Sequence, residues 1–113
     1  MIKPVRVQLS RRKGWHKPDN TVVVARPTVW GNPFPIGVLG REEAVKRFRA
    51  MIADPAEMTA WLYPSIKQIR EKLRGKNLAC WCPQPAPGEQ DHCHAAVLVE
   101  IANAETVPGS PDA

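Results

Sequence analysis

Cysteine and histidine gather in one short stretch of this sequence and could bind a metal ion. Cys80 and Cys82 are one residue apart, and Cys93 and His94 follow after a loop. Side chains at i and i+2 of a strand lie about 6.5–7 Å apart, whereas zinc holds thiolate sulfurs about 2.3 Å from the ion, so the strand end must bend for both to bind. We therefore expect a Cys₃His site for zinc, formed by Cys80, Cys82, Cys93 and His94, with His92 as a substitute ligand.

Two other interpretations of these residues stay open. Cys80 and Cys82 can be small buried apolar side chains of a core strand. Alternatively, Cys93 and His94 are catalytic, because a helix N-terminus and a neighbouring histidine lower the pKa of a thiol and make it a nucleophile.

All three cysteines lie in this stretch, and an odd, local set is not typical of a disulfide-stabilised protein. The sequence therefore indicates reduced thiols.

Positive charge concentrates near the N-terminus. Residues 1–26 hold seven lysines and arginines against one acid, and the whole chain has a net charge of +5. The densest part, residues 11–13, is followed by Gly14 and Trp15. Cations beside an indole can hold a phosphate while the ring stacks on a base, so a nucleotide or nucleic acid is the expected partner. The same loop could equally be an exposed basic segment whose tryptophan folds over the core.

A second aromatic loop follows at residues 27–40. Its prolines and glycines indicate an ordered, irregular segment, too long for a simple connection in a small domain. Asn32 offers donors and acceptors for a base edge or a ribose, although Trp30 to Phe34 could also be a rigid turn that completes the core. The candidate ligand-binding residues of the two loops are Arg11, Arg12, Lys13, Trp15, Arg26, Trp30 and Asn32.

The elements that must position these residues follow the order β-β-α-α-β-α. Strands are expected at 4–10, 21–25 and 77–82, and helices at 41–52, 55–73 and 91–103. Pro64 should kink or split the second helix, and Asp91 is placed to cap the last one. A strand after a helical crossover usually lies parallel to an earlier strand. We therefore expect an α/β fold with a small three-stranded, partly parallel sheet and helices packed on it.

This topology would bring the two groups of candidate residues together. In open α/β sheets the binding crevice lies beyond the carboxyl ends of the strands. The loops after Ala25 and after Cys82 would both lie there if their strands are parallel. Arg26, in the loop after Ala25, and the cysteines would then lie in one cleft.

The length and hydropathy of the chain limit the classes of protein to which it can belong. The 113 residues fit one α/β domain, 1–104, followed by a polar tail, 105–113, which we expect to be flexible. No apolar run approaches the roughly 18 residues that cross a bilayer, and no secretory signal is evident. A cytoplasmic location without a membrane partner is expected, and nothing predicts the oligomeric state.

At these motifs the sequence resembles a family of bacteria and their phages known only as domain of unknown function 4326. The resemblance extends from about Val5 to Asn103. It rests mainly on Arg12-Lys13-Gly14-Trp15, Asn20-Thr21-Val22, Arg26-Pro27, Trp30-Gly31-Asn32-Pro33-Phe34, Leu73 to Cys82, and Cys93-His94-Ala95. It implies that the three cysteines and His94 belong to a shared pattern, and it implies no activity. The segment between Cys82 and Cys93 is longer than the usual spacer.

Three functions are consistent with these features. The first is a small domain that binds a phosphate-bearing ligand, a nucleotide or nucleic acid, in an Arg/Trp-lined cleft shaped by the Cys/His cluster and its zinc. The second is an enzyme that acts on a nucleotide or nucleobase through Cys93 or a metal-bound water. The sequence lacks a Walker loop, a dinucleotide-binding glycine signature and a zinc-deaminase pattern. The third is a phage-type protein that inhibits or sequesters a host component.

Overall fold

The three strands of this protein are short and parallel. The computed structural model describes residues 4–104, so the tail predicted for 105–113 lies outside the described residues. β1 (Arg6–Gln8) and β2 (Thr21–Val23) both pair with β3 (Asn77–Cys80), which is the central strand. The α/β class is confirmed, and the sheet is parallel throughout. Each strand is shorter than predicted, because pairing on both sides of β3 covers only its four residues.

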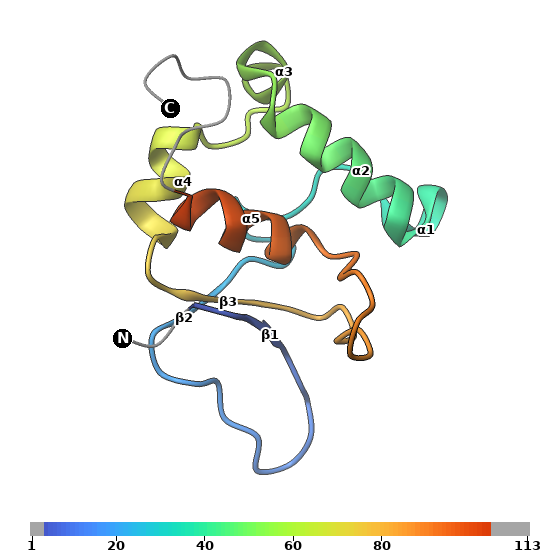
Figure 1. Ribbon diagram of the computed structural model, residues 1–113, viewed down its shortest axis with the longest axis vertical. Coiled ribbons are helices and arrows are strands. Elements are labelled where there is room, and N and C mark those ends of the chain that lie inside the picture. Colours follow the sequence, from blue (N-terminus) through green and yellow to red (C-terminus); the bar gives the residue numbers. More distant parts are fainter. Residues whose placement is uncertain (1–3, 105–113) are drawn as a thin grey trace.

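The helices lie on one face of this sheet (Figure 1). They are α1 (Ile36–Leu39), α2 (Arg41–Ile52), α3 (Pro55–Ala60), α4 (Ile66–Leu73) and α5 (His94–Asn103). α5 contacts β3, α4 and α2, so it occupies the centre of the helical layer. The core is apolar and buried, with Phe48, Ile69, Leu78 and Leu98 fully enclosed. Each such side chain stabilises the fold by about 1.5–3 kcal/mol relative to exposure.

The structure confirms the predicted split of the second helix at Pro64 and corrects the predicted start of the last helix. The helix expected at 55–73 is split at Pro64 into α3 and α4, and α4 has its own capping box at Ser65. The last helix begins at His94 rather than at Asp91, because the Asp91 carboxylate pairs with Arg6 and does not cap the helix. None of the helices in the described part of the chain is long and apolar enough to span a membrane.

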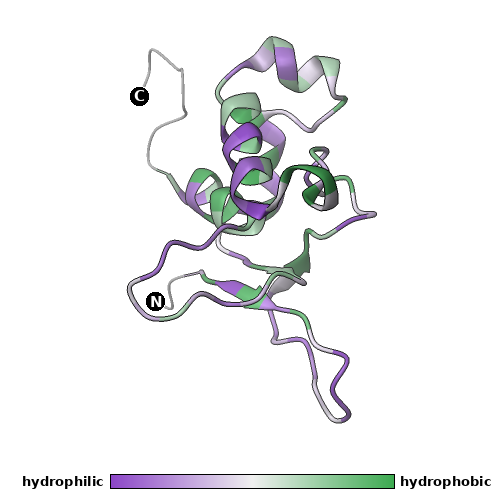
Figure 2. Ribbon diagram, turned by 90° about the vertical axis from the view of Figure 1, so that its right-hand side faces the viewer, coloured by the Kyte–Doolittle hydropathy of each residue, from purple (hydrophilic) through white to green (hydrophobic). Residues whose placement is uncertain are grey.

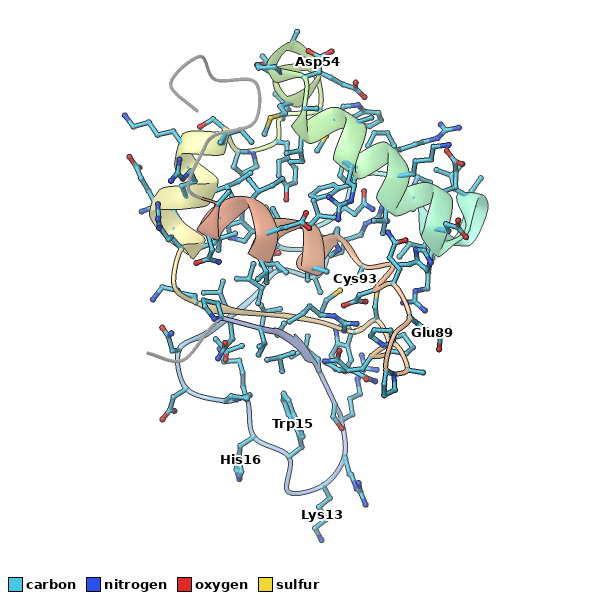
Figure 3. All side chains as sticks on the ribbon, viewed as in Figure 1. Lys13, Trp15, His16, Asp54, Glu89 and Cys93 are labelled. Atoms are coloured by element: carbon cyan, nitrogen blue, oxygen red, sulfur yellow. The ribbon has the colours of Figure 1, made fainter. Side chains whose placement is uncertain are left out.

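The opposite face of the sheet carries the connection between β1 and β2. Since these two strands are parallel, residues 9–20 must return from the carboxyl end of β1 to the start of β2, and they do so without a helix (Figure 1). Trp15 points from this loop toward the sheet (Figure 3) and packs against the core. The far end of the loop is hydrophilic (Figure 2). The basic loop predicted from the sequence, residues 10–20, is therefore a crossover held to the sheet by its tryptophan.

Candidate metal centre and adjoining pocket

Three cysteines bring their sulfur atoms together at the carboxyl end of β3. The Sγ atoms of Cys80, Cys82 and Cys93 all lie within 4.8 Å of one another, and those of Cys80 and Cys82 are 3.9 Å apart. Tetrahedral zinc with bonds of about 2.3 Å places its sulfur ligands about 3.8 Å apart. β3 ends at Cys80, and this end of the strand provides the bend that a C-x-C pair requires. The three thiols can therefore hold a metal ion.

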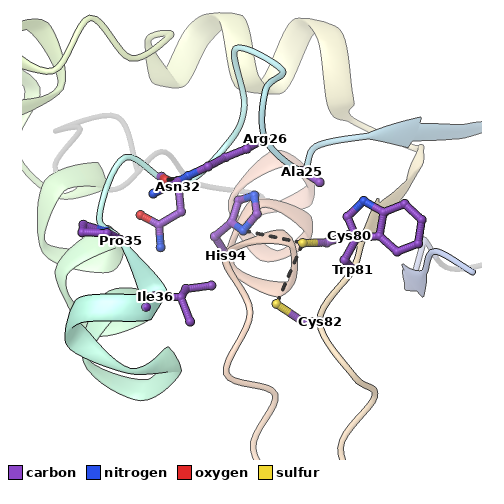
Figure 4. A pocket seen from close by; sticks show the side chains of 10 residues that line it. Ala25, Arg26, Asn32, Pro35, Ile36, Cys80, Trp81, Cys82 and His94 are labelled. Carbon is purple, nitrogen blue, oxygen red and sulfur yellow. Dashed lines mark hydrogen bonds between the residues drawn. The ribbon is translucent and has the colours of Figure 1, made fainter.

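His94 presents one ring nitrogen to these sulfurs (Figure 4). Its Nε2 lies 2.7 Å from the carbonyl oxygen of Val24, and because a carbonyl only accepts, Nε2 carries the proton. The unprotonated Nδ1 lies 4.0 Å from Cys80 Sγ. Metal-bound histidines are commonly held in this way through their other ring nitrogen. His94 stands outside the group of three mutually close sulfurs, so it lies at the edge of the cluster.

Burial and hydrogen bonding set the protonation of the cluster. The cysteines are buried, and Cys93 has no exposed surface. Hydrogen bonds from Cys82 and Cys93 lower the pKa of the Cys80 thiol. The hydrogen bond to Cys80 raises the pKa of the Cys93 thiol, and burial lowers the pKa of His94. The cluster thus favours a thiolate at Cys80 and a neutral imidazole, which are the forms that bind zinc.

These properties bear on the alternative role of Cys93. A nucleophilic thiol needs a lowered pKa and access to its substrate. Cys93 is enclosed, and its pKa moves upward rather than in the direction expected for the start of a helix. The geometry therefore favours Cys93 as a ligand or a structural thiol over Cys93 as a nucleophile.

A buried ion pair fixes the loop between Cys82 and Cys93. The Arg6 guanidinium donates to both carboxylate oxygens of Asp91, from Nε at 2.8 Å and from Nη2 at 2.7 Å. Its other hydrogen bonds go to the carbonyl oxygens of Cys82 and Pro83. Arg6 therefore ties β1 to both ends of the loop. The sequence does not predict this role, because the alternation in residues 4–10 places Arg6 on the polar face of its strand.

A pocket of about 290 Å³ adjoins the cluster. Its lining residues are Ala25, Arg26, Asn32, Pro35, Ile36, Gly37, Cys80, Trp81, Cys82 and His94. The loops after β2 and β3 meet here because the carboxyl ends of parallel strands lie at one edge of the sheet. The predicted meeting of these loops is therefore observed. Trp81 is not among the predicted ligand-binding residues, although its place between two cysteines was an available signal.

Arg26 and Asn32 differ in what they offer to a ligand. Arg26 Nε donates to the Asn32 carbonyl oxygen at 2.7 Å, while its two terminal nitrogens have no hydrogen-bond partner within residues 4–104. The buried Asn32 side chain accepts from the Phe34 N–H and donates to the Ala44 carbonyl oxygen. Gly31 permits the close approach, because a Cβ there would lie 2.9 Å from Arg26 Cγ. Arg26 therefore has free donors, and Asn32 holds the loop in place.

Four other predicted ligand-binding residues lie in three different places. Arg11 lies over the Trp81 ring, with its Cζ 4.3 Å from the ring centroid. Arg12 and Lys13 are exposed in the basic loop and line none of the described pockets. Lys13 lies at the far end of this loop (Figure 3). Trp30 lies elsewhere, since its carbonyl oxygen accepts from the Tyr63 hydroxyl and it lines a separate groove. The structure therefore brings Arg26 and Asn32 to the pocket beside the cysteine cluster, places Arg11 on the ring of Trp81, and leaves Trp30 apart from the cluster.

Fold and site together define a small α/β protein with a cysteine-rich pocket at the carboxyl edge of a parallel sheet. The chain belongs to the family described as domain of unknown function 4326, whose sequence model matches residues 7–104. No curated protein and no solved structure matches the chain.

Proposed function

We propose that this protein binds a phosphate-bearing ligand, a nucleotide or a nucleic acid, in the pocket beside the cysteine cluster. The observation that carries the proposal is that Arg26, whose terminal nitrogens have no protein partner within residues 4–104, lines the same pocket as Trp81, whose indole extends outward from the pocket (Figure 4). A guanidinium binds phosphate oxygens in pairs, and an indole stacks on a base. The position at the carboxyl ends of β2 and β3 is where open α/β sheets bind ligands.

Zinc at Cys80, Cys82, Cys93 and His94 forms one wall of the pocket in this proposal. Thiolate and imidazole ligands select zinc over magnesium or calcium, and the spacing of the sulfurs suits a tetrahedral ion. Such an ion joins the end of β3 to the start of α5. Its role with four protein ligands is structural, because binding energy at such a site contributes to folding.

The metal is tested by elemental analysis of protein purified without an affinity tag, together with a thiol count. We expect about one zinc per chain, and thiols that react only after a chelator is added. Cys82→Ser should lose most of the zinc, whereas His92→Ala, beside the cluster but outside the proposed set, should retain it. Metal-free protein with three reactive thiols would contradict the zinc site.

Ligand binding is tested by titrating nucleoside monophosphates while following tryptophan emission at low salt. Arg26→Ala should weaken binding roughly ten- to a hundredfold, because hydrogen bonds to charged groups contribute about 1.5–3 kcal/mol. Arg47→Ala, an exposed cation of α2 that pairs with Glu43, is the matched control and should leave the affinity unchanged. The absence of any response to all the nucleotides and to a short single strand of nucleic acid would refute the proposal.

One observation favours a second function, hydrolysis by a metal-bound water. Since His94 stands outside the three sulfurs, an ion held by the cysteines alone would keep an open position near the pocket. Cobalt substitution separates the two cases. If the cobalt spectrum changes in His94→Ala and does not respond to added azide, the ion has four protein ligands and a structural role. If the spectrum shifts when azide is added, the ion has the open coordination position that hydrolysis needs.

A further inference from the structure

We propose that the ligand is a single strand of nucleic acid, with one nucleotide in the pocket and its neighbouring phosphates along the basic loop, residues 10–20. This inference rests on the proposed function and names its ligand class. It assigns a role to cations that the pocket does not use.

The cations of the basic loop are exposed, and none of them forms an ion pair within residues 4–104. They are Arg11, Arg12, Lys13 and Lys17, and Asp19 is the only acid of the loop. The salt bridges formed within residues 4–104 involve other cations, on β1, α2 and α4. Unpaired cations clustered on one segment attract a polyanion and release its counterions on binding. The loop therefore has the charge of a phosphate-binding surface.

Arg11 connects this charge to the pocket. Its guanidinium lies over the Trp81 ring, and Trp81 is both 43% exposed and part of the pocket lining. A guanidinium held over an indole by a cation–π contact still has N–H groups that can donate to phosphate. The rest of the indole offers a surface on which a base can stack. Aromatic and cationic groups thus continue from the pocket onto the loop.

The extent of this surface requires a ligand longer than one nucleotide. Lys13 lies at the far end of the loop, well away from Cys93 and the cluster (Figure 3). A mononucleotide in the pocket cannot reach it, whereas a strand can contact Arg26, Arg11 and Lys13 in turn. A base enters a pocket only after it leaves its stack, which costs a few kcal/mol in a duplex and least in a single strand. The single strand is therefore the favoured form.

The test compares each nucleoside monophosphate with a mixed-sequence single strand of about 12 nucleotides, within the range of site sizes of small strand-binding domains. We expect the strand to bind at least tenfold more tightly. Its logarithmic salt slope should be about −2 to −3 between about 50 and 200 mM salt, because each phosphate contact contributes about 0.7. The variant Arg12→Ala/Lys13→Ala/Lys17→Ala should reduce that slope by about 2 and abolish most of the preference for the strand.

A matched variant removes the same charge from the helices. Lys46→Ala/Arg47→Ala/Lys67→Ala changes exposed cations of α2 and α4, and it should keep both the slope and the preference. An equal loss in this control would overturn the inference, because total charge rather than the loop would then bind the strand. Equally tight, loop-dependent binding to vesicles of anionic phospholipid at the same ionic strength would also overturn it, in favour of a membrane surface.

The outcomes also separate this inference from the proposed function. Monophosphate binding that requires Arg26 and shows no preference for the strand would refute the inference and leave the function standing. Failure of both monophosphate and strand to bind would refute both. Strand binding that survives Arg26→Ala with the same affinity would show that the loop acts without the pocket, which also contradicts the inference.

Discussion

At the scale of single residues, Arg6 decides how the loop beside the cysteines is held. Its side chain is 4% exposed, and that of its partner Asp91 is 18% exposed. Arg6→Gln leaves this carboxylate and the carbonyl oxygens of Cys82 and Pro83 without their donor. Because loss of one partner of a buried pair typically costs about 3–5 kcal/mol, and Asp91 is partly solvated, we expect the free energy of unfolding to fall by about 3 kcal/mol.

Urea unfolding measures this effect, and an exposed ion pair provides its control. Arg47 and Glu43 are 53% and 44% exposed, so Arg47→Gln should cost less than about 0.5 kcal/mol. Equal effects of the two substitutions would mean that the buried guanidinium contributes no more than a solvated surface cation.

The buried phenol of Tyr63 should lower the stability of the folded state at high pH. Burial raises the pKa of this phenol above its usual 10.0, and its hydroxyl donates to the Trp30 carbonyl oxygen at 2.6 Å. Because the raised pKa belongs to the folded state, the contribution of Tyr63 to stability is complete below pH 10. It is lost as the pH rises further, since only the unfolded chain then releases the proton. We expect the free energy of unfolding to fall by about 1.4 kcal/mol per pH unit above pH 10.

The chain contains a single tyrosine, so its ionisation can be followed directly. The ultraviolet absorbance of tyrosinate should rise together with the loss of the circular dichroism signal. Tyr63→Phe should remove most of the slope above pH 10, at a cost of about 1 kcal/mol at neutral pH for the lost hydrogen bond. Tyrosinate that forms in protein that is still folded would contradict the assignment.

The residue types in the sequence predicted the cysteine cluster better than they predicted the residues that surround it. Three cysteines and a histidine in one stretch give a metal hypothesis from spacing alone, and their sulfurs do meet. Arg6 and Asp91 are 85 positions apart, and no local pattern connects them. Trp30 and Asn32 have the types of ligand-binding residues, but a type does not show whether a group is already engaged. Their carbonyl and amide groups are used within the fold.

At the scale of elements, α4 depends on how it begins after Pro64. The Ser65 side chain accepts from the Gln68 N–H at 3.2 Å, and the Gln68 side chain accepts from the Ser65 N–H at 2.9 Å. This capping box satisfies two donors that a helix start leaves unpaired. Ser65→Ala should therefore lower the free energy of unfolding by about 1 kcal/mol.

A threonine in the neighbouring helix is the control for this substitution. Thr59 donates from its hydroxyl to the Pro55 carbonyl oxygen inside α3, where the bond caps nothing. Thr59→Ala should change the stability by less than about 0.5 kcal/mol, because alanine has the higher helix propensity. Both variants are compared by urea unfolding, and a cost at Ser65 no larger than that at Thr59 would mean that the capping box is not needed.

Elements with strong periodicity were predictable, and short ones were not. α2 has the predicted bounds, because its apolar stripe buries Ala44, Val45 and Phe48 against the core. α1 has four residues and none of them is buried, so it leaves no periodic signal in a loop rich in proline and glycine. The start of α5 was misplaced because Asp91 has the type of a capping residue, whereas its carboxylate is held by Arg6.

At the scale of the whole molecule, the sheet separates the helical layer from the basic loop, and these two layers meet at the carboxyl edge of the sheet. Helices cover one face of the sheet, and the basic loop crosses the other (Figure 1). The pocket lies at the carboxyl ends of β2 and β3, where the helical layer, the cysteine cluster and the rim residue Trp81 come together. A ligand bound there contacts groups from both layers. The parallel topology is therefore what makes a shared site for metal and ligand feasible.

Zinc and ligand should bind cooperatively, because the proposed metal site is also a wall of the pocket. Cys80 and His94 both line the pocket, and His94 holds the Val24 carbonyl two residues before Arg26. Loss of the ion should therefore displace the loop that carries Arg26. We expect zinc removal to weaken nucleotide binding about five- to 150-fold, the range of typical coupling free energies.

This coupling must be reciprocal, so saturating nucleotide should raise the zinc affinity by the same factor. Equilibrium competition with a chromogenic chelator, with and without nucleotide, measures the effect of nucleotide on the zinc affinity. Nucleotide titrations of zinc-bound and zinc-free protein measure the effect of zinc on the nucleotide affinity. In Arg26→Ala, nucleotide should no longer shift the zinc affinity, because the group through which the two sites communicate is absent. Equal nucleotide affinities in the zinc-bound protein and in a zinc-free protein that is still folded would place the ligand away from the cysteine cluster.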